Sequence, residues 1–70
     1  MVERRLGNRL KAVRAERNLT QAELALIIGV SRKTINTIEN SVFVPSTLLA
    51  LTLAQALDLK VEEMFFIVDV

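Results

Sequence analysis

The stretch that decides the fold is residues 21–40, QAELALIIGVSRKTINTIEN. It predicts two short helices joined at Gly29, where a tight turn needs a positive φ that glycine adopts readily. Thr20 precedes the first helix and Glu23 follows three residues later, which is the spacing of a capping box. Ser31 carries a side-chain oxygen suited to capping the second helix. Two capped helices joined by a glycine turn indicate a helix-turn-helix, at about residues 20–40.

The second of these helices has one polar face. At 100° per residue, its polar side chains fall within an arc of about 140°, away from Ile35 and Ile38. The residues of this arc are Arg32, Lys33, Asn36, Thr37 and Asn40. Arg and Lys suit guanine edges, Asn suits adenine, and Thr suits several bases. We therefore assign the first four to base contacts in a DNA major groove; the alternative is a solvated face without a ligand.

Residues 20–25, 29–32 and 34–40 resemble the helix-turn-helix of the phage repressor, Cro and xenobiotic-response-element family. The likeness extends through residues 45–46 and 50–57, and so covers nearly the whole chain. It is most similar to the small stand-alone dimeric members, such as the cytolysin regulator. The resemblance implies an all-α, lambda-repressor-like fold of five helices over residues 1–70 as a single domain.

The resemblance also assigns roles outside the polar face. It implies that Arg14 pairs with Glu39 as a strut between helices, and the helical wheel separately places Glu39 beside Ile35. The alternative is an exposed pair that contributes about 0–1 kcal/mol. We expect contacts to DNA phosphates from Arg14, Gln21, Asn40 and Ser41. For Gln21 the alternative is an ordinary polar residue at a helix N-terminus.

The composition excludes several functions. The 70 residues include neither cysteine nor histidine, so disulfides, cysteine-based zinc sites and histidine catalysis are absent. We expect no enzyme activity, no metal and no cofactor. The net charge is +1, but residues 1–18 carry +4 and residues 41–70 carry −3. This asymmetry could orient one side of the molecule toward phosphates. A charged N-terminus and the absence of a long apolar run predict a cytoplasmic protein without membrane contact.

The remaining helices are predicted from apolar spacing and caps. We expect helices over residues 3–18, 21–28, 47–57 and 61–65. The first is predicted from the spacing of Leu6, Leu10 and Val13. Residues 41–45, SVFVP, form an apolar loop where relatives usually carry phosphate-binding side chains, and we expect Phe43 to fold onto the core.

The C-terminal residues 66–70, FIVDV, predict a short β-strand. A strand needs a partner for its backbone groups. Three arrangements remain open: pairing with an extended segment around residues 1–2, pairing with a second subunit, or both. Hydrophobic content of 51% in so small a chain also favours oligomerisation. The expected dimer interface consists of Phe66, Ile67, Val68, Val70 and Leu49.

Together these observations predict a sequence-specific DNA-binding transcriptional regulator. We expect a homodimeric repressor that binds double-stranded DNA at a palindromic operator. The alternative is an antitoxin-like protein-interaction module of the same fold, with another protein as its partner. The apolar loop and the surplus leucines Leu48, Leu49 and Leu51 favour that alternative.

Overall fold

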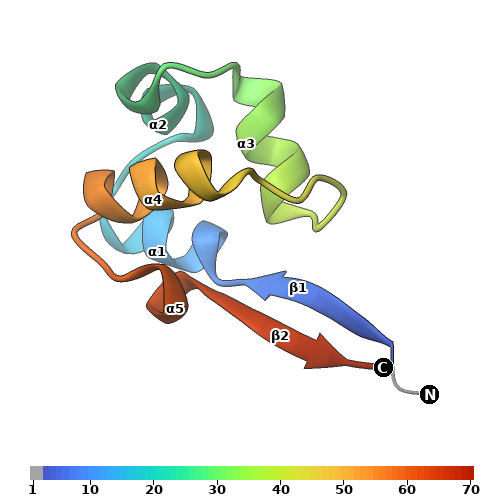
Figure 1. Ribbon diagram of the computed structural model, residues 1–70. Coiled ribbons are helices and arrows are strands. Elements are labelled where there is room, and N and C mark those ends of the chain that lie inside the picture. The colour runs from blue at the N-terminus through green and yellow to red at the C-terminus, as the bar shows by residue number, and fades with distance from the viewer. Residues whose placement is uncertain (1–2) are drawn as a thin grey trace.

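A computed structural model describes residues 3–70 as a group of helices from which a two-stranded antiparallel ribbon extends (Figure 1). The molecule is 40 Å long and 22 by 21 Å across, because the ribbon reaches beyond the helices. The elements in chain order are β1 (Arg4–Asn8), α1 (Leu10–Glu16), α2 (Gln21–Ile28), α3 (Arg32–Glu39), α4 (Thr47–Ala56), α5 (Val61–Met64) and β2 (Phe65–Asp69).

The helix-turn-helix is confirmed as α2 and α3. The Thr20 hydroxyl oxygen accepts from the backbone N–H of Glu23 at 3.0 Å, and the Glu23 carboxylate accepts from the backbone N–H of Thr20 at 2.9 Å. Gly29 ends α2 with a φ of 76°. Ser31 caps α3, since its hydroxyl oxygen accepts from the backbone N–H of Thr34 at 3.2 Å. These local interactions set both helix boundaries.

The hydrophobic core lies between the five helices and the start of β2. Leu24 and Ala25 of α2 meet Ile35 and Ile38 of α3 in this core. The buried residues are Leu10, Val13, Leu24, Ala25, Ile35, Ile38, Leu53, Ala54, Leu57, Met64 and Phe65. Burial of one face of α3 fixes its other face toward the outside.

The prediction of one helix over residues 3–18 was wrong. Residues Arg4–Asn8 form β1, and α1 begins only at Leu10. Gly7 would destabilise a helix at that point. If residues 4–8 were helical, the backbone N–H and C=O groups of β2 would have no strand to pair with. The Asn8 side chain stabilises the start of α1, because its Oδ1 accepts from the backbone N–H of Leu10, the first helical residue, at 3.1 Å. Leu6 therefore lies half-buried in a strand instead of on a helical stripe.

The two strands pair in a register that runs from Asn8 opposite Phe65 to Arg4 opposite Asp69. The tail thus pairs with its own chain, although with residues 4–8; the segment around residues 1–2 lies outside the described residues. Gly7 lies opposite Phe66 and is covered by that ring, since an added Cβ would clash with it. The strand is confirmed, and it has a second strand as its partner.

The loop after α3 is more exposed than the sequence predicted. Phe43 is 46% exposed, so the expectation that it folds onto the core was wrong. The neighbouring Val42 and Val44 are also exposed, because the loop turns outward after α3.

Three helices are followed by residues other than glycine in the left-handed conformation, namely Asn18, Ser41 and Asp58. Within residues 3–70, no helix has the length and apolar character needed to cross a membrane.

Candidate nucleic-acid interface

The outer face of α3 presents three exposed polar side chains. Arg32, Lys33 and Asn36 are exposed, whereas Ile35 and Ile38 on the opposite face are 0% and 1% exposed. Thr37, the fourth residue assigned to base contacts, is half-buried, and its hydroxyl donates to the backbone oxygen of Thr34 at 3.0 Å. The Thr37 hydroxyl proton is therefore already engaged, while its oxygen can still accept and its methyl group can pack against a base.

The first residue of α2 joins this face. Gln21, Arg32, Lys33 and Asn36 line one shallow hollow of about 260 Å³. The N-terminus of α2 and the outer face of α3 thus form one continuous polar surface. A surface of this kind can place an amide beside a DNA phosphate while the neighbouring helix reaches the base edges.

A largely buried ion pair holds α3 against α1. Arg14 donates from Nε to one Glu39 oxygen at 2.7 Å and from its terminal nitrogen to the other at 3.2 Å. The side chains of Arg14 and Glu39 are only 14% and 3% exposed. A third Arg14 bond goes to the backbone oxygen of Leu19 at 2.8 Å. The predicted strut is confirmed, and the alternative of an exposed pair is excluded.

The ion pair shifts the pKa of both partners. Burial alone raises the pKa of Glu39, but the hydrogen bonds from Arg14 and Gln21 outweigh it, and the pKa lies below its ordinary value. The nearby positive charge of Lys11 acts in the same direction. The hydrogen bond to Glu39 raises the pKa of Arg14. Both groups are therefore charged at neutral pH.

Sequence reasoning missed one member of this network. Gln21 donates from Nε2 to the Glu39 carboxylate at 3.0 Å. This bond joins the first residue of α2 to the last residue of α3, and no local sequence pattern signals such a pair. It leaves the second N–H of the Gln21 amide free for an external acceptor. Glu39 therefore both fixes α3 and orients the amide at the start of α2.

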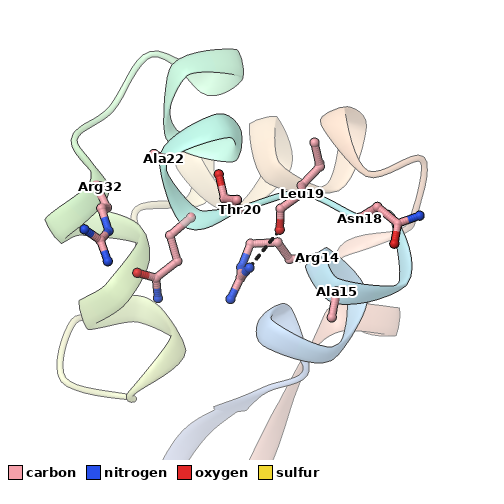
Figure 2. Close-up of a pocket in the computed structure, with 8 residues that line it drawn as sticks. Arg14, Ala15, Asn18, Leu19, Thr20, Ala22 and Arg32 are labelled. Atoms are coloured by element: carbon pink, nitrogen blue, oxygen red, sulfur yellow. Dashed lines mark hydrogen bonds between the residues drawn. The ribbon is translucent and has the colours of Figure 1, made fainter.

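Figure 2 shows a wider hollow beside this network. It has a volume of about 750 Å³, and its lining includes Arg14, Thr20, Gln21 and Arg32. Arg32 lies on one side, at the start of α3, and Arg14 lies on the other, donating to the Leu19 carbonyl. The Arg32 guanidinium, the Gln21 amide and the positive end of α2 make this hollow suitable for an anion, whereas the charge of Arg14 is balanced by Glu39.

The remaining two phosphate candidates lie at the other end of α3. Asn40 donates from Nδ2 to the backbone oxygen of Asn36 at 3.0 Å and to the Asn36 side-chain oxygen at 3.2 Å. Ser41 follows in the left-handed conformation, with a φ of 58°. Neither Asn40 nor Ser41 is among the residues lining the two hollows. The structure thus brings Arg14 and Gln21 together with the base candidates, and places Asn40 in contact with Asn36.

Comparisons with known proteins agree with this geometry. A family model described as helix-turn-helix matches residues 10–64. A helix-turn-helix transcriptional regulator of Methanocaldococcus jannaschii is 45% identical over 64 residues, which cover 91% of this chain and 97% of the relative. A second such regulator, from Bacillus subtilis, is 38% identical over 62 residues, or 89% of this chain and 94% of the relative.

Solved structures show the same fold. The restriction-modification controller protein C.AhdI of Aeromonas hydrophila has a TM-score of 0.74 and 33% identity, over 79% of this chain and 83% of that chain. A candidate DNA-binding protein from Bacteroides fragilis has a TM-score of 0.79 and 28% identity, over 87% and 98%. The chain belongs to the Cro/C1-type helix-turn-helix family of DNA-binding transcriptional regulators.

Proposed function

We propose that this protein is a dimeric repressor that binds a palindromic operator through α3 in the major groove. In this proposal, base edges are contacted by Arg32, Lys33, Asn36 and Thr37, and phosphates by Gln21, Arg14, Asn40 and Ser41. The observation that carries it is the outer face of α3, where Arg32, Lys33 and Asn36 are exposed beside Gln21 while Ile35 and Ile38 anchor the helix from behind.

The phosphate roles differ in kind. Gln21 has one amide N–H engaged with Glu39 and a second that is available. Arg14 has three donor contacts inside the protein and a side chain only 14% exposed. We therefore assign Gln21 to direct contact. The charge of Arg14 is balanced by Glu39, so Arg14 would support phosphate binding mainly by holding Glu39, and through it the Gln21 amide, in place.

The proposed dimer would place two copies of α3 on one face of the DNA. Its interface includes Phe66, Ile67, Val68, Val70 and Leu49. The first four are exposed side chains at the C-terminal end of the chain, whereas Leu49 is half-buried and packs partly against the core. Two-fold symmetry in the protein matches a palindromic site whose halves are about one helical turn apart.

Competition binding tests the base-reading role. A preferred site would first be selected from random duplex DNA and then compared with its scrambled version. We expect Asn36→Ala to lower affinity for the selected site by about 1–3 kcal/mol, with little change for scrambled DNA. Gln21→Ala should weaken binding to both DNAs equally, because a phosphate contact does not depend on sequence.

Gln55→Ala on α4 is the matched control, since Gln55 is exposed and lies outside the proposed interface with DNA. It should bind both DNAs as the parent does. Equal losses on both DNAs for Asn36→Ala would remove Asn36 from the base-reading set. Failure of the parent to prefer any sequence would contradict the proposed repressor.

A second function is favoured by one observation. The loop that follows α3 exposes Val42, Phe43 and Val44 by 77%, 46% and 68%. An antitoxin-like module would use such a surface to hold another protein. Co-expression with the product of each neighbouring gene tests this alternative, and a stoichiometric complex that Val44→Asp abolishes would support it.

A further inference from the structure

Two asparagine side chains lie one helical turn apart on α3. Asn36 and Asn40 are both exposed, and their spacing of four residues places them on the same side of the helix. Asn36 lines the shallow hollow between α2 and α3 described above, and Asn40 is not among the residues that line it. Asn36 therefore belongs to the surface proposed to contact bases, and Asn40 lies one turn further along, at the C-terminal end of α3.

The hydrogen bonds of Asn40 fix the orientation of its amide. Its Nδ2 lies 3.0 Å from the backbone oxygen of Asn36 and 3.2 Å from Asn36 Oδ1. A backbone oxygen can only accept, so the Asn40 atom that faces it is the nitrogen and not the oxygen. The two hydrogens of this nitrogen then serve the two oxygens of Asn36, one each.

The orientation of the Asn36 amide follows from that of Asn40. The Asn36 atom that faces Asn40 Nδ2 has to accept a hydrogen bond, so it is Oδ1. Asn36 Nδ2, with its two N–H groups, therefore points away from Asn40. Asn36 Oδ1 keeps a second lone pair after it accepts from Asn40. The Asn36 side chain thus presents two donors and one acceptor site in an arrangement that its neighbour sets.

We propose that Asn40 is a positioning residue, which holds the Asn36 amide so that its N–H donors face a base edge. The inference rests on the function proposed above and identifies the base that Asn36 reads. In the major groove adenine offers the acceptor N7 beside the N6 donor, whereas cytosine offers only the N4 donor. Asn36 therefore selects adenine, because Nδ2 donates to N7 and the second lone pair of Oδ1 accepts from N6.

The same bonds bear on the phosphate contact assigned to Asn40. Both hydrogens of its amide are engaged within α3, and only Asn40 Oδ1 remains. This oxygen carries no hydrogen, so it cannot donate to a phosphate. The Asn40 amide would reach a phosphate only by breaking one of its two bonds, whereas the intact pair serves the selection of a base.

The strength of the pair depends on its surroundings. In water, a hydrogen bond between side chains four residues apart favours one orientation by a factor of only about two. An interface with DNA excludes water, and the same bond is stronger there. The positioning by Asn40 therefore acts mainly in the complex, where it raises the selectivity for the base.

Selection of binding sites from random duplex DNA tests the proposal. In the parent, one position of each half-site should prefer adenine, and Asn36→Ala should abolish this preference and so identify the position. Asn40→Ala should lower the preference for adenine over cytosine there by roughly two- to tenfold, the equivalent of one hydrogen bond. In Asn40→Asp the new carboxylate only accepts, so Asn36 Nδ2 should turn toward it and Asn36 Oδ1 toward the base. The preference should then shift toward cytosine, whose N4 donates.

Ser41→Asp is the matched control, because it adds the same charge at the next residue and leaves Asn40 in place. It should weaken binding to all sequences, since a negative charge repels phosphates, and leave the preference at this position unchanged. Helical circular dichroism checks that every variant folds.

Nuclear magnetic resonance of the DNA-free protein gives a second readout. Asn36→Ala removes one of the two acceptors of the Asn40 amide, so one Asn40 Hδ2 signal should shift. Arg32→Ala leaves both acceptors and should not shift it. Asn40 signals that stay unchanged in Asn36→Ala would overturn the pairing.

The outcomes separate this inference from the proposed function. A parent with a clear sequence preference that Asn40→Ala and Asn40→Asp leave unaltered overturns the positioning role alone. Equal losses on every sequence in both Asn40 variants do the same, because they identify a phosphate contact. A parent that prefers no sequence refutes the proposed repressor, and with it any base reading by Asn36.

Discussion

Removal of Glu39 offers the sharpest test of how α3 is held against α1. The carboxylate accepts two hydrogen bonds from Arg14 and one from Gln21, and its side chain is 3% exposed. In Glu39→Ala, the Arg14 guanidinium keeps only its bond to the Leu19 carbonyl. The Arg14 side chain is 14% exposed and lines the hollow of Figure 2, so water can replace part of the lost contacts.

The expected cost follows from that geometry. Breaking a buried ion pair by removing one partner costs about 3–5 kcal/mol, and the partial exposure of Arg14 favours the lower end. A 70-residue domain has a total stability of about 3.5–10 kcal/mol. We therefore expect a loss of about 3 kcal/mol, which lowers Tm by roughly 12–24 °C.

Urea unfolding followed by circular dichroism measures this loss. Glu16→Ala is the matched control, because the Glu16–Arg17 pair is 3.9 Å apart and largely exposed. Its removal should cost less than about 1 kcal/mol. If Glu39→Ala lost no more stability than Glu16→Ala, the buried pair would not be what holds α3 against α1.

Further predictions concern pH, the helix ends and salt. The pKa of Glu39 in the folded protein lies below its ordinary value of 4.5. The charged Glu39 therefore stabilises the fold fully above pH 4.5, and this contribution is lost as the pH falls from 4.5 through the folded pKa. Glu39→Gln should flatten the acid limb of a curve of stability against pH. Ser41 has a φ of 58°, which glycine adopts more readily, so Ser41→Gly should raise the free energy of unfolding measured in urea by about 0.5–1 kcal/mol. Gly29 has a φ of 76°, and although an added Cβ would meet open space, Gly29→Ala should lower the free energy of unfolding by about 1–2 kcal/mol. Val42→Lys should steepen the slope of log affinity against log salt by up to about 0.9, and an unchanged slope would mean that the loop lies away from the DNA backbone.

The helix-turn-helix was predictable from sequence because its determinants are local. The pairing of Thr20 with Glu23, the turn at Gly29 and the cap at Ser31 each depend on residues within one helical turn. The alternation of Ile35 and Ile38 with polar residues likewise fixed which face of α3 is buried. For the candidate site, these local signals placed Arg32, Lys33 and Asn36 correctly on the exposed face.

The errors arose where distant residues decide the structure. Leu6 continues the helical apolar spacing of Leu10 and Val13, yet residues 4–8 form a strand because residues 65–69 supply their backbone partners. The bond between Gln21 and Glu39 joins two helices, so neither residue's neighbours in sequence reveal it. Phe43 was expected in the core on hydrophobicity alone, but the outward turn after Ser41 leaves it exposed.

The pairing of β1 with β2 also bears on the order in which the chain folds. The ribbon joins residues near the two ends of the described chain, so its contacts close almost the whole length of the polypeptide into one loop. The α2–α3 contacts, in contrast, join segments adjacent in sequence. Loop-closure entropy delays long-range contacts, and the ribbon should therefore form after the helices have packed. Weakening it, for example by Ile67→Ala, should speed unfolding while leaving the folding rate nearly unchanged.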